Sequence, residues 1–265
     1  MILNNKYVVL ENIASGEFGA LVKVQYNNAN YAIKIGAKEA IKYEAMIYKE
    51  LKGVANISKI YDIFEFNSNY CLVLDYYNKT LNSVKEETFS TSPSYIVSVL
   101  NYIKELIYII SEVHSKHIIH RDIKPSNICL ANNKVFLIDF GISKIYKIGR
   151  IHNNESKISG LVGSVNFSSL NIINCIEPSR RDDIESTIYV LLYMLLSHTS
   201  YNEYNNLEII QKKDGSRIID ILKTNYANII DYELFSKLFN YIRRLKYNQQ
   251  PNYDYIITLL CSLIK

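Results

Sequence analysis

Short runs of β-branched and aromatic residues dominate the first third of the chain. They occur at 7–10, 21–26 and 30–35, and Asn27-Asn28 separates the last two runs. Such runs predict strands, and the two asparagines are typical of a hairpin turn. A stretch rich in Lys, Glu and Ala over 37–51 predicts a helix, and two further runs predict strands at 60–65 and 70–76.

The pattern changes after Ser92-Pro93. Over 96–113, hydrophobic residues recur every three or four positions, which is the spacing of one face of a helix. Ser followed by Pro is typical of the start of such a helix. Two short strands are expected at 128–130 and 135–138, and the final third of the chain has a helical pattern with polar connections.

These patterns predict an α+β protein with two lobes. The small lobe, residues 1–76, is rich in strands and has one main helix. The larger lobe, residues 77–265, is mainly helical, and a short connector near 75–80 joins the two. With 265 residues, of which 48% are hydrophobic, the chain can bury a substantial core, so extensive disorder is excluded.

Charge and cysteine content exclude several classes of protein. The net charge is +4, but Lys and Arg are spread along the chain, so no nucleic-acid interface stands out. The four cysteines form no short-spaced pair typical of zinc sites or disulfide scaffolds. We find no signal peptide and no apolar run near the ~20 residues of a membrane span, so we expect an intracellular protein, cytoplasmic or nuclear. The excess of Asn, Ile, Lys and Tyr is typical of an A/T-rich genome, and if that genome is viral we expect the host cell cytoplasm.

The candidate chemistry lies in two segments near the middle of the chain. Ile-His-Arg-Asp-Ile-Lys-Pro-Ser-Asn ends at Asn127, and Ile-Asp-Phe-Gly contains Asp139, which follows Asp122 by 17 positions. This set resembles the signature of protein kinases. Phosphoryl transfer mainly needs positioning and neutralisation of phosphate charge. Asp122 can accept the proton of a substrate hydroxyl, Lys124 supplies charge near the transferred phosphate, and Asn127 and Asp139 are oxygen ligands suited to Mg²⁺.

Residues upstream complete the predicted nucleotide site. Lys34 ends an apolar strand, as the lysine that contacts nucleotide phosphates does, and Glu44 on the predicted helix is its expected ion-pair partner. The segment 13–19, Ile-Ala-Ser-Gly-Glu-Phe-Gly, is similar to a glycine-rich phosphate loop, although Ala14 replaces the first glycine of G-x-G-x-x-G. Backbone amides of the loop can still approach phosphates, and the contributing residues are Ala14, Gly16, Phe18 and Gly19.

Later segments resemble the casein kinase one family of Ser/Thr protein kinases. Glu-Pro-Ser-Arg-Arg-Asp-Asp-Ile-Glu-Ser at 177–186 is the most specific, and 163–171, 245–253 and 43–49 are also similar to segments of that family. Vaccinia-related kinases share the Ser-Arg-Arg element but usually replace the residues at Arg121 and Pro125.

The resemblance implies a bilobal protein-kinase fold and one kinase domain over 1–265. It implies ATP and Mg²⁺ as cofactors and proteins with Ser or Thr hydroxyls as substrates, and we expect a monomer. Asp183 would brace the catalytic loop, and Ser164 would lie beside Asp122. The adenine site and hinge would be formed by Ala32, Leu74, Asp75, Tyr76 and Tyr77.

Three hypotheses remain open at this level. The first is an active Ser/Thr kinase, with Lys34, Glu44, Asp122, Lys124 and Asn127 as catalytic residues. The second is a weak or inactive kinase-like scaffold, suggested by three departures from the family pattern: Ala14, Asn166 in place of a substrate-binding Arg, and Ile188 in place of a small Gly. The third is a nucleic-acid or membrane-surface module, against which the dispersed charge argues. We also expect no regulatory tail, because the chain ends soon after its last helical segment.

Overall fold

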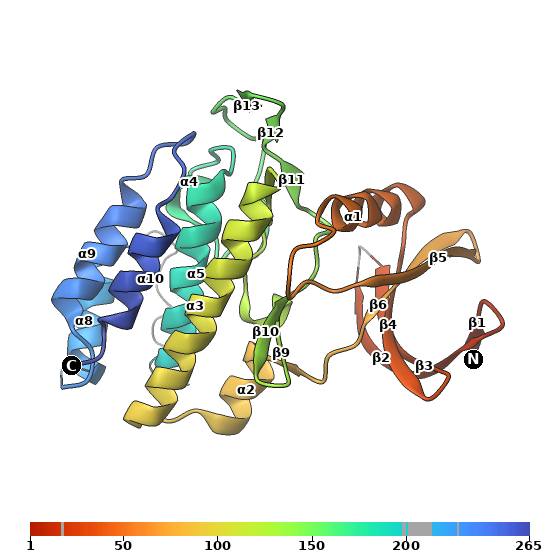
Figure 1. The fold of residues 1–265 in the computed structure, drawn as a ribbon, viewed down its shortest axis with the longest axis horizontal. Helices are drawn as coiled ribbons and strands as arrows, with labels where there is room; N and C mark the ends of the chain where they lie inside the picture. The colour runs from red at the N-terminus through yellow and green to blue at the C-terminus, as the bar shows by residue number, and fades with distance from the viewer. Residues whose placement is uncertain (17–18, 198–199, 201–213, 227) are drawn as a thin grey trace.

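The computed structural model describes residues 1–16, 19–197, 200, 214–226 and 228–265. Figure 1 shows two lobes, a sheet-rich lobe that contains the N-terminus and a helical lobe that contains the C-terminus. The predicted α+β bilobal architecture is therefore confirmed.

An antiparallel sheet forms most of the small lobe, and its strands run in the order β1-β2-β3-β4-β6-β5. One face buries a cluster around Tyr7, Val24 and Ile33, and helix α1 covers the other face. The strand β6 shows why: Cys71 and Val73 enter the first cluster, whereas the alternating Leu72 and Leu74 pack toward the main core, as the two-residue period of a strand requires. The bounds are β1 Ile2–Leu3, β2 Tyr7–Gly16, β3 Gly19–Tyr26, β4 Ala29–Gly36, α1 Lys38–Glu50, β5 Ile60–Phe66 and β6 Asn69–Asp75.

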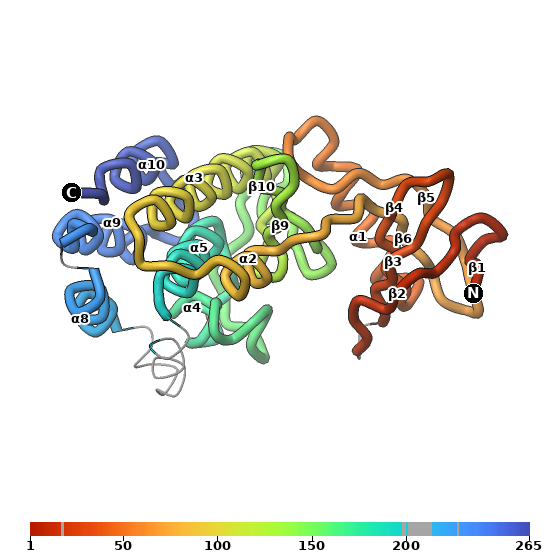
Figure 2. Tube along the Cα trace, turned by 90° about the horizontal axis from the view of Figure 1, so that it is seen from below, coloured from red at the N-terminus to blue at the C-terminus, as the bar shows by residue number. Residues whose placement is uncertain are grey.

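Helices α3 and α5 form the centre of the large lobe. Ser92 accepts a hydrogen bond from the Tyr95 amide and Pro93 occupies the first turn, so α3 begins where its sequence predicts. α5 is buried on almost all sides, and Figure 2 shows α8, α9 and α10 side by side at the end of the lobe farthest from the small lobe. The helices are α2 Leu81–Thr88, α3 Pro93–Ser115, α4 Leu170–Ile173, α5 Arg180–Leu195, α8 Gly215–Tyr226, α9 Tyr232–Arg243 and α10 Tyr253–Cys261.

Short strands of the large lobe hold the central segments in place. β9 pairs with both β7 and β10, and β8 pairs with β11, so the segments 118–119 and 128–145 are tied together by main-chain hydrogen bonds. A single 3₁₀ turn, Pro125–Asn127, leads into β9. The strands are β7 Lys79–Thr80, β8 Ile118–Ile119, β9 Ile128–Ala131, β10 Lys134–Leu137, β11 Lys144–Ile145, β12 Lys147–Ile148 and β13 Ile151–His152.

Several short elements have no counterpart among the predictions from sequence: α2, α4, β1, β7, β8, β11 and the hairpin β12–β13. α2 is short and polar, and a capping box between Thr80 and Ser83 starts it, so hydrophobic periodicity alone does not reveal it. The hairpin β12–β13 has two residues per strand, too few to show an alternating pattern. The strands β3, β4, β5, β6, β9 and β10 and the helices α1 and α3 agree with the expected ranges to within a few residues, whereas β2 extends to Gly16. The helices α5, α8, α9 and α10 lie in the final third of the chain, for which the sequence predicts a helical pattern.

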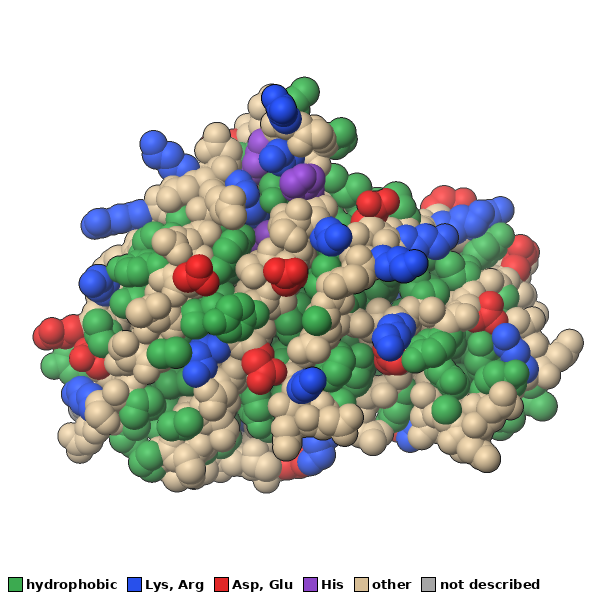
Figure 3. All heavy atoms as spheres, viewed as in Figure 1, with side chains coloured by type: hydrophobic (Ala, Val, Ile, Leu, Met, Phe, Trp, Pro, Cys, Tyr) green, Lys and Arg blue, Asp and Glu red, His purple; other side chains and the backbone are tan. Residues whose placement is uncertain are grey.

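The surface matches the dispersed charge of the sequence. Figure 3 shows Lys and Arg scattered over the visible face with Asp and Glu among them, rather than gathered into one basic band. Among the described residues, no helix combines the length and the apolar character needed to cross a membrane.

Candidate active site

The acid at the start of α5 holds the backbone of the loop that follows β8. Asp183 accepts from the amide of His120 through Oδ2, at 2.7 Å, and from the amide of Arg121 through Oδ1, at 2.9 Å. Arg121 has a φ of +73°, a left-handed conformation that costs a non-glycine residue of the order of 1 kcal/mol. Charge-assisted hydrogen bonds to both amides offset that cost. The geometry expected for Asp183 from the family resemblance is therefore present.

Burial and neighbouring groups set the charge state of this acid. Burial by itself would raise the pKa of Asp183, but the hydrogen bond from His114 and its other donors outweigh burial and lower that pKa below its usual value. His114 lies inside α3 and is 2% exposed, and burial lowers the pKa of its ring. Sequence inspection did not single out His114; the one available signal is its position directly after the apolar stripe of 96–113, four residues beyond Ile110.

The ring of His120 connects the catalytic loop to the segment after β10. Its Nδ1 accepts from the Asp122 amide at 3.2 Å, so Nε2 carries the proton and donates to the Ile138 carbonyl at 3.0 Å. The ring also packs edge to face on Phe140, with 4.8 Å between centroids. These contacts fix the two motif segments relative to each other.

The Asp122 carboxylate is held from both sides. Oδ1 accepts from the Ser164 amide at 2.9 Å, and Oδ2 accepts from Nδ2 of Asn127 at 3.1 Å. Nζ of Lys124 lies 2.7 Å from Oδ2 of Asp122 and donates to Oγ of Ser164 at 3.0 Å. The predicted catalytic residues of the large lobe therefore meet at one place, with Ser164 beside Asp122.

Gly163 allows the segment of Ser164 to lie close to the catalytic loop. Its φ is +79°, and a Cβ there would lie 2.4 Å from the Arg121 carbonyl oxygen. A side chain at this position would push the segment of Ser164 away from the catalytic loop.

Lys34 joins the two lobes. Its Nζ lies 2.8 Å from Oε2 of Glu44 on α1 and 2.6 Å from Oδ1 of Asp139, which follows β10. Burial opposes the charge of Lys34, but the two carboxylates outweigh burial and raise its pKa. Burial would likewise raise the pKa of Asp139, but Lys34 lowers it, so the carboxylate is ionised at neutral pH.

The donor set fits a magnesium ion shared with a phosphate. Asn127 donates through Nδ2 to Asp122, so its amide oxygen is available as a ligand, and the Asp139 side chain is 39% exposed. The described residues contain no group of three or more His, Cys, Asp or Glu that could enclose a metal. Magnesium bound by one or two protein oxygens usually takes its other ligands from phosphate and water, which is what this pair of residues can support.

The described residues of the glycine-rich segment lie at the paired ends of β2 and β3. Gly16 pairs with Gly19, which has a φ of +123°, and a Cβ on Gly19 would lie 1.9 Å from the Ile35 carbonyl oxygen. Ala14 is an exposed strand residue paired with Leu21, a conformation that does not require glycine. Phe18, which we expect to contribute to this loop, lies outside the described residues.

The predicted adenine site lies at the end of β4 and β6. Ala32 pairs with Leu74, which is 7% exposed, and the connector begins at Asp75. The Asp75 side chain accepts from the Lys59 amide and from the Tyr61 hydroxyl, each at 2.7 Å, so it is directed toward the region of β5.

The two tyrosines of the connector are held by neighbouring side chains. Nζ of Lys23 lies over the Tyr76 ring at 4.6 Å, and Tyr77 contacts the ring of Phe136 at 4.9 Å. Both rings thus have side-chain contacts of their own, and the binding of a base by the connector backbone stays a prediction.

The family departures have different structural settings. Ile188 is fully buried in the main core, so it replaces a small residue with packed hydrocarbon. Asn166 is half-buried in the turn that follows Ser164. Neither residue takes part in the contacts of Lys34, Asp122 and Asp139 described above.

Comparison with known proteins places the chain beside protein kinases. The family model described as "Protein kinase domain" matches residues 7–262. A protein of Encephalitozoon cuniculi (strain GB-M1) described as "Probable casein kinase I homolog" is 31% identical over 273 aligned positions, which span 96% of this chain and 83% of that protein.

Proposed function

The chain belongs to the protein kinase family and is a casein kinase 1-like Ser/Thr kinase, and from this premise we propose that it uses ATP and Mg²⁺ and that the residues joined at the lobe interface carry the reaction. The observation that most directly supports the proposal is Lys34, which contacts Glu44 and Asp139 from two different lobes at 2.8 and 2.6 Å. A lysine that binds nucleotide phosphates beside a metal-binding acid would make these contacts, which supports both proposed roles.

The proposed reaction transfers the γ-phosphoryl group of ATP to a Ser or Thr hydroxyl of a protein. Asp122 orients the hydroxyl and accepts its proton while the bond from that oxygen to phosphorus forms and the bond to the ADP oxygen breaks. The Ser164 amide and the Asn127 side chain hold the carboxylate in position. Lys124, 3.0 Å from the Ser164 hydroxyl, stabilises charge on the transferred group.

The nucleotide is held by residues of both lobes. Lys34 binds its phosphates, Ala14, Gly16, Phe18 and Gly19 form the loop over them, and the connector at Asp75, Tyr76 and Tyr77 binds the base, with Ala32 and Leu74 beside it. Magnesium held by Asn127 and Asp139 would neutralise phosphate charge. The inactive alternative is weakened because Ala14 has an ordinary strand conformation and Ile188 is a packing residue.

Two measurements test the proposal. Asp122→Asn should lower the rate of phosphate transfer from ATP to a protein acceptor by roughly 10²–10⁴-fold with little change in melting temperature. Asp220→Asn, an exposed acid on α8, is the matched control and should keep full activity. In parallel, addition of Mg·ATP should raise the melting temperature of the wild type and leave that of Asp139→Ala unchanged. Full activity of Asp122→Asn would refute its role, and a wild type without transfer and without a thermal shift would favour the scaffold.

A further inference from the structure

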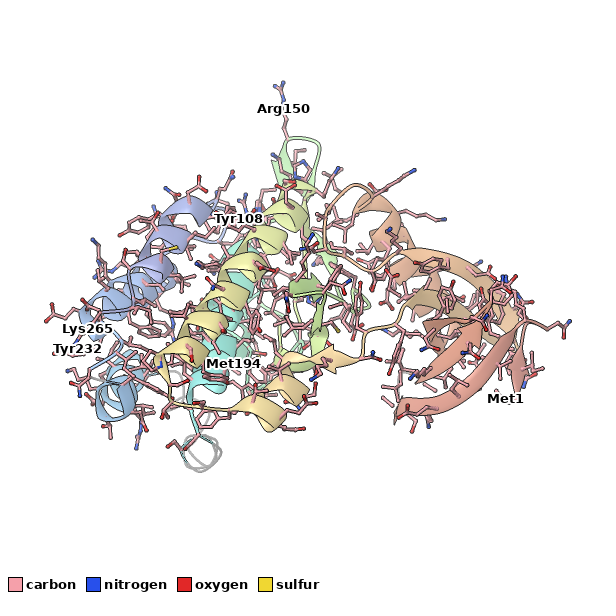
Figure 4. All side chains as sticks on the ribbon, turned by 60° about the horizontal axis from the view of Figure 1, so that its bottom comes forward. Met1, Tyr108, Arg150, Met194, Tyr232 and Lys265 are labelled. Atoms are coloured by element: carbon pink, nitrogen blue, oxygen red, sulfur yellow. The ribbon has the colours of Figure 1, made fainter. Side chains whose placement is uncertain are left out.

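A small hairpin between Asp139 and Ser164 carries two exposed isoleucines. Ile148 on β12 pairs with Ile151 on β13, and the two residues are 74% and 78% exposed. Directly paired residues of a hairpin direct their side chains to the same face, so the two isoleucines form one apolar surface. The hairpin stands out from the large lobe in Figure 1, and Arg150, at its turn, points away from the body of the protein in Figure 4.

The base of the hairpin is firmly held. The ring of His152 lies between Tyr146 and Tyr247, with centroids 5.1 and 5.2 Å away. Asn153 donates through its amide to the Tyr146 carbonyl at 2.8 Å and through its side chain to the Ile145 carbonyl at 3.0 Å. An anchored base means that little conformational freedom is lost when the tip binds something, which favours recognition.

The charged residues in the segment that contains the hairpin are all basic. No Asp or Glu occurs from 140 to 154, whereas Lys144, Lys147 and Arg150 do. Glu155, which follows the hairpin in sequence, pairs with Arg181 at 2.6 Å, and Glu177 pairs with Lys144 of β11 at 2.8 Å. The tip therefore presents apolar surface next to the positive charges of Lys147 and Arg150, which pair with neither of those carboxylates.

We propose that the hairpin tip, formed by Ile148, Arg150 and Ile151, is a docking site for protein substrates and binds an acidic segment that carries apolar side chains. Exposed apolar residues in one patch are typical of interaction sites, and the basic charge selects an acidic partner. Because the hairpin belongs to the segment that ends at Ser164 beside Asp122, a docked protein is held close to the residues that carry the transfer. The inference rests on the proposed transfer to protein hydroxyls.

Two other occupants fit the tip less well. Stable attachment to a lipid surface takes more buried hydrocarbon or a larger basic cluster than two isoleucines and one arginine supply. A second copy of the chain would bring a like-charged tip against this one, which the repulsion between basic residues disfavours.

The test compares a protein substrate with a short one. We would measure steady-state kinetics with dephosphorylated casein, an acidic protein, and with a short Ser peptide that is too small to reach both the tip and Asp122. In the double variant Ile148→Ser/Ile151→Ser, the KM for casein should rise about tenfold with kcat unchanged, as expected for loss of an interface anchor. The kinetics of the peptide should stay at the wild-type values. Arg150→Glu should likewise raise the KM for casein and leave the peptide kinetics unchanged.

A second exposed apolar pair supplies the control. Ile2 and Val8 are paired across β1 and β2 of the small lobe and are 58% and 44% exposed, so Ile2→Ser/Val8→Ser should change neither substrate's kinetics. The proposal would be overturned if replacement of Ile148 and Ile151 raised the KM equally for casein and peptide, or raised it for neither. The proposal would also be overturned if the wild type bound anionic vesicles, or associated with itself, and the double variant did not.

Direct binding separates this proposal from the proposed function. The affinity of casein for the Asp122→Asn protein should fall about tenfold when Ile148 and Ile151 are replaced, whether or not the wild type transfers phosphate. Unchanged casein binding would refute the docking site alone, whereas a wild type that transfers no phosphate, together with weakened casein binding in the isoleucine variant, would refute the proposed function alone.

Discussion

The phenol oxygen of Tyr253 lies 2.7 Å from Nδ1 of His114, whose other ring nitrogen lies 2.9 Å from the Asp183 carboxylate. A carboxylate only accepts hydrogen bonds, so Nε2 of His114 carries the proton. Burial lowers the pKa of the ring, so at neutral pH Nδ1 is an acceptor for the Tyr253 hydroxyl. Tyr253, at the start of α10, thereby fixes the tautomer that holds Asp183 and, through it, the catalytic loop.

Tyr253→Phe tests this connection. The buried Nδ1 would lose its donor, which should lower the free energy of unfolding by about 1–3 kcal/mol. With Asp183 less firmly oriented, kcat should fall by about tenfold, which corresponds to ~1.4 kcal/mol, while the KM for ATP stays near its wild-type value. Tyr255→Phe, on the same helix, is the control. Wild-type kcat in Tyr253→Phe would show that the phenol has only a structural role.

Gly163→Ala should separate the catalytic loop from the segment of Ser164. The added Cβ would lie 2.4 Å from the Arg121 carbonyl oxygen at a φ of +79°, so the backbone must move. We expect a loss of roughly 1–3 kcal/mol in stability and of at least about 10²-fold in activity, because Asp122 loses the Ser164 amide. Gly160→Ala is the comparison on the same segment, since its Cβ would have no heavy atom within 4 Å. Similar activities in the two variants would refute the steric argument.

Glu44→Gln should weaken the bridge between the lobes. The amide keeps the size of the side chain but removes the charge that pairs with Lys34 at 2.8 Å. A buried hydrogen bond to a charged group contributes about 1.5–3 kcal/mol, so kcat/KM for ATP should fall by roughly 10- to 100-fold. Glu50→Gln, exposed at the end of the same helix, should leave kcat/KM unchanged. An unaltered kcat/KM in Glu44→Gln would mean that Asp139 alone positions Lys34.

Lys85 predicts an unusual dependence of stability on pH. The residue is fully buried in α2, Nζ donates to the Tyr193 carbonyl, and burial lowers its pKa to about 8. Because this pKa lies below the value of 10.5 for a free lysine, the unfolded chain binds more protons between pH 8 and 10.5, and the contribution of Lys85 to stability rises over that range. The change amounts to about 3 kcal/mol.

Denaturant unfolding of Lys85→Met against the wild type measures this effect. Methionine has a similar shape and no charge, so the variant should be the more stable protein at pH 7. Its advantage should shrink as pH rises from 8 to 10, since the wild-type lysine then loses its proton in the folded state. A difference between the two proteins that stays constant with pH would contradict the lowered pKa.

Local patterns predicted most of the longer helices and strands, because side-chain periodicity and capping residues depend on neighbours along the chain. The apolar stripe of 96–113 and the Ser92-Pro93 start predict α3, and alternating β-branched runs predict β3 and β4. The chemical groups of the site could likewise be named in advance, because phosphoryl transfer needs few residue types at characteristic spacings, as with Asp122, Asn127 and Asp139. The sequence also raised a doubt at Ala14, which its ordinary strand conformation removes.

The sequence by itself determined the membership of the kinase family, the residues that we propose carry the chemistry, and most segments that form helices and strands, since all of these depend on neighbours along the chain. Only the tertiary structure decided which distant groups meet. Lys34 reaches Asp139 across 105 positions, and His114 reaches Tyr253 across 139. No local pattern encodes such pairs, because they arise when the hydrophobic faces of separate elements pack together and bring polar groups into a region where they must find partners. The same packing left Ile148 and Ile151 outside the core, which is why they are available to a partner.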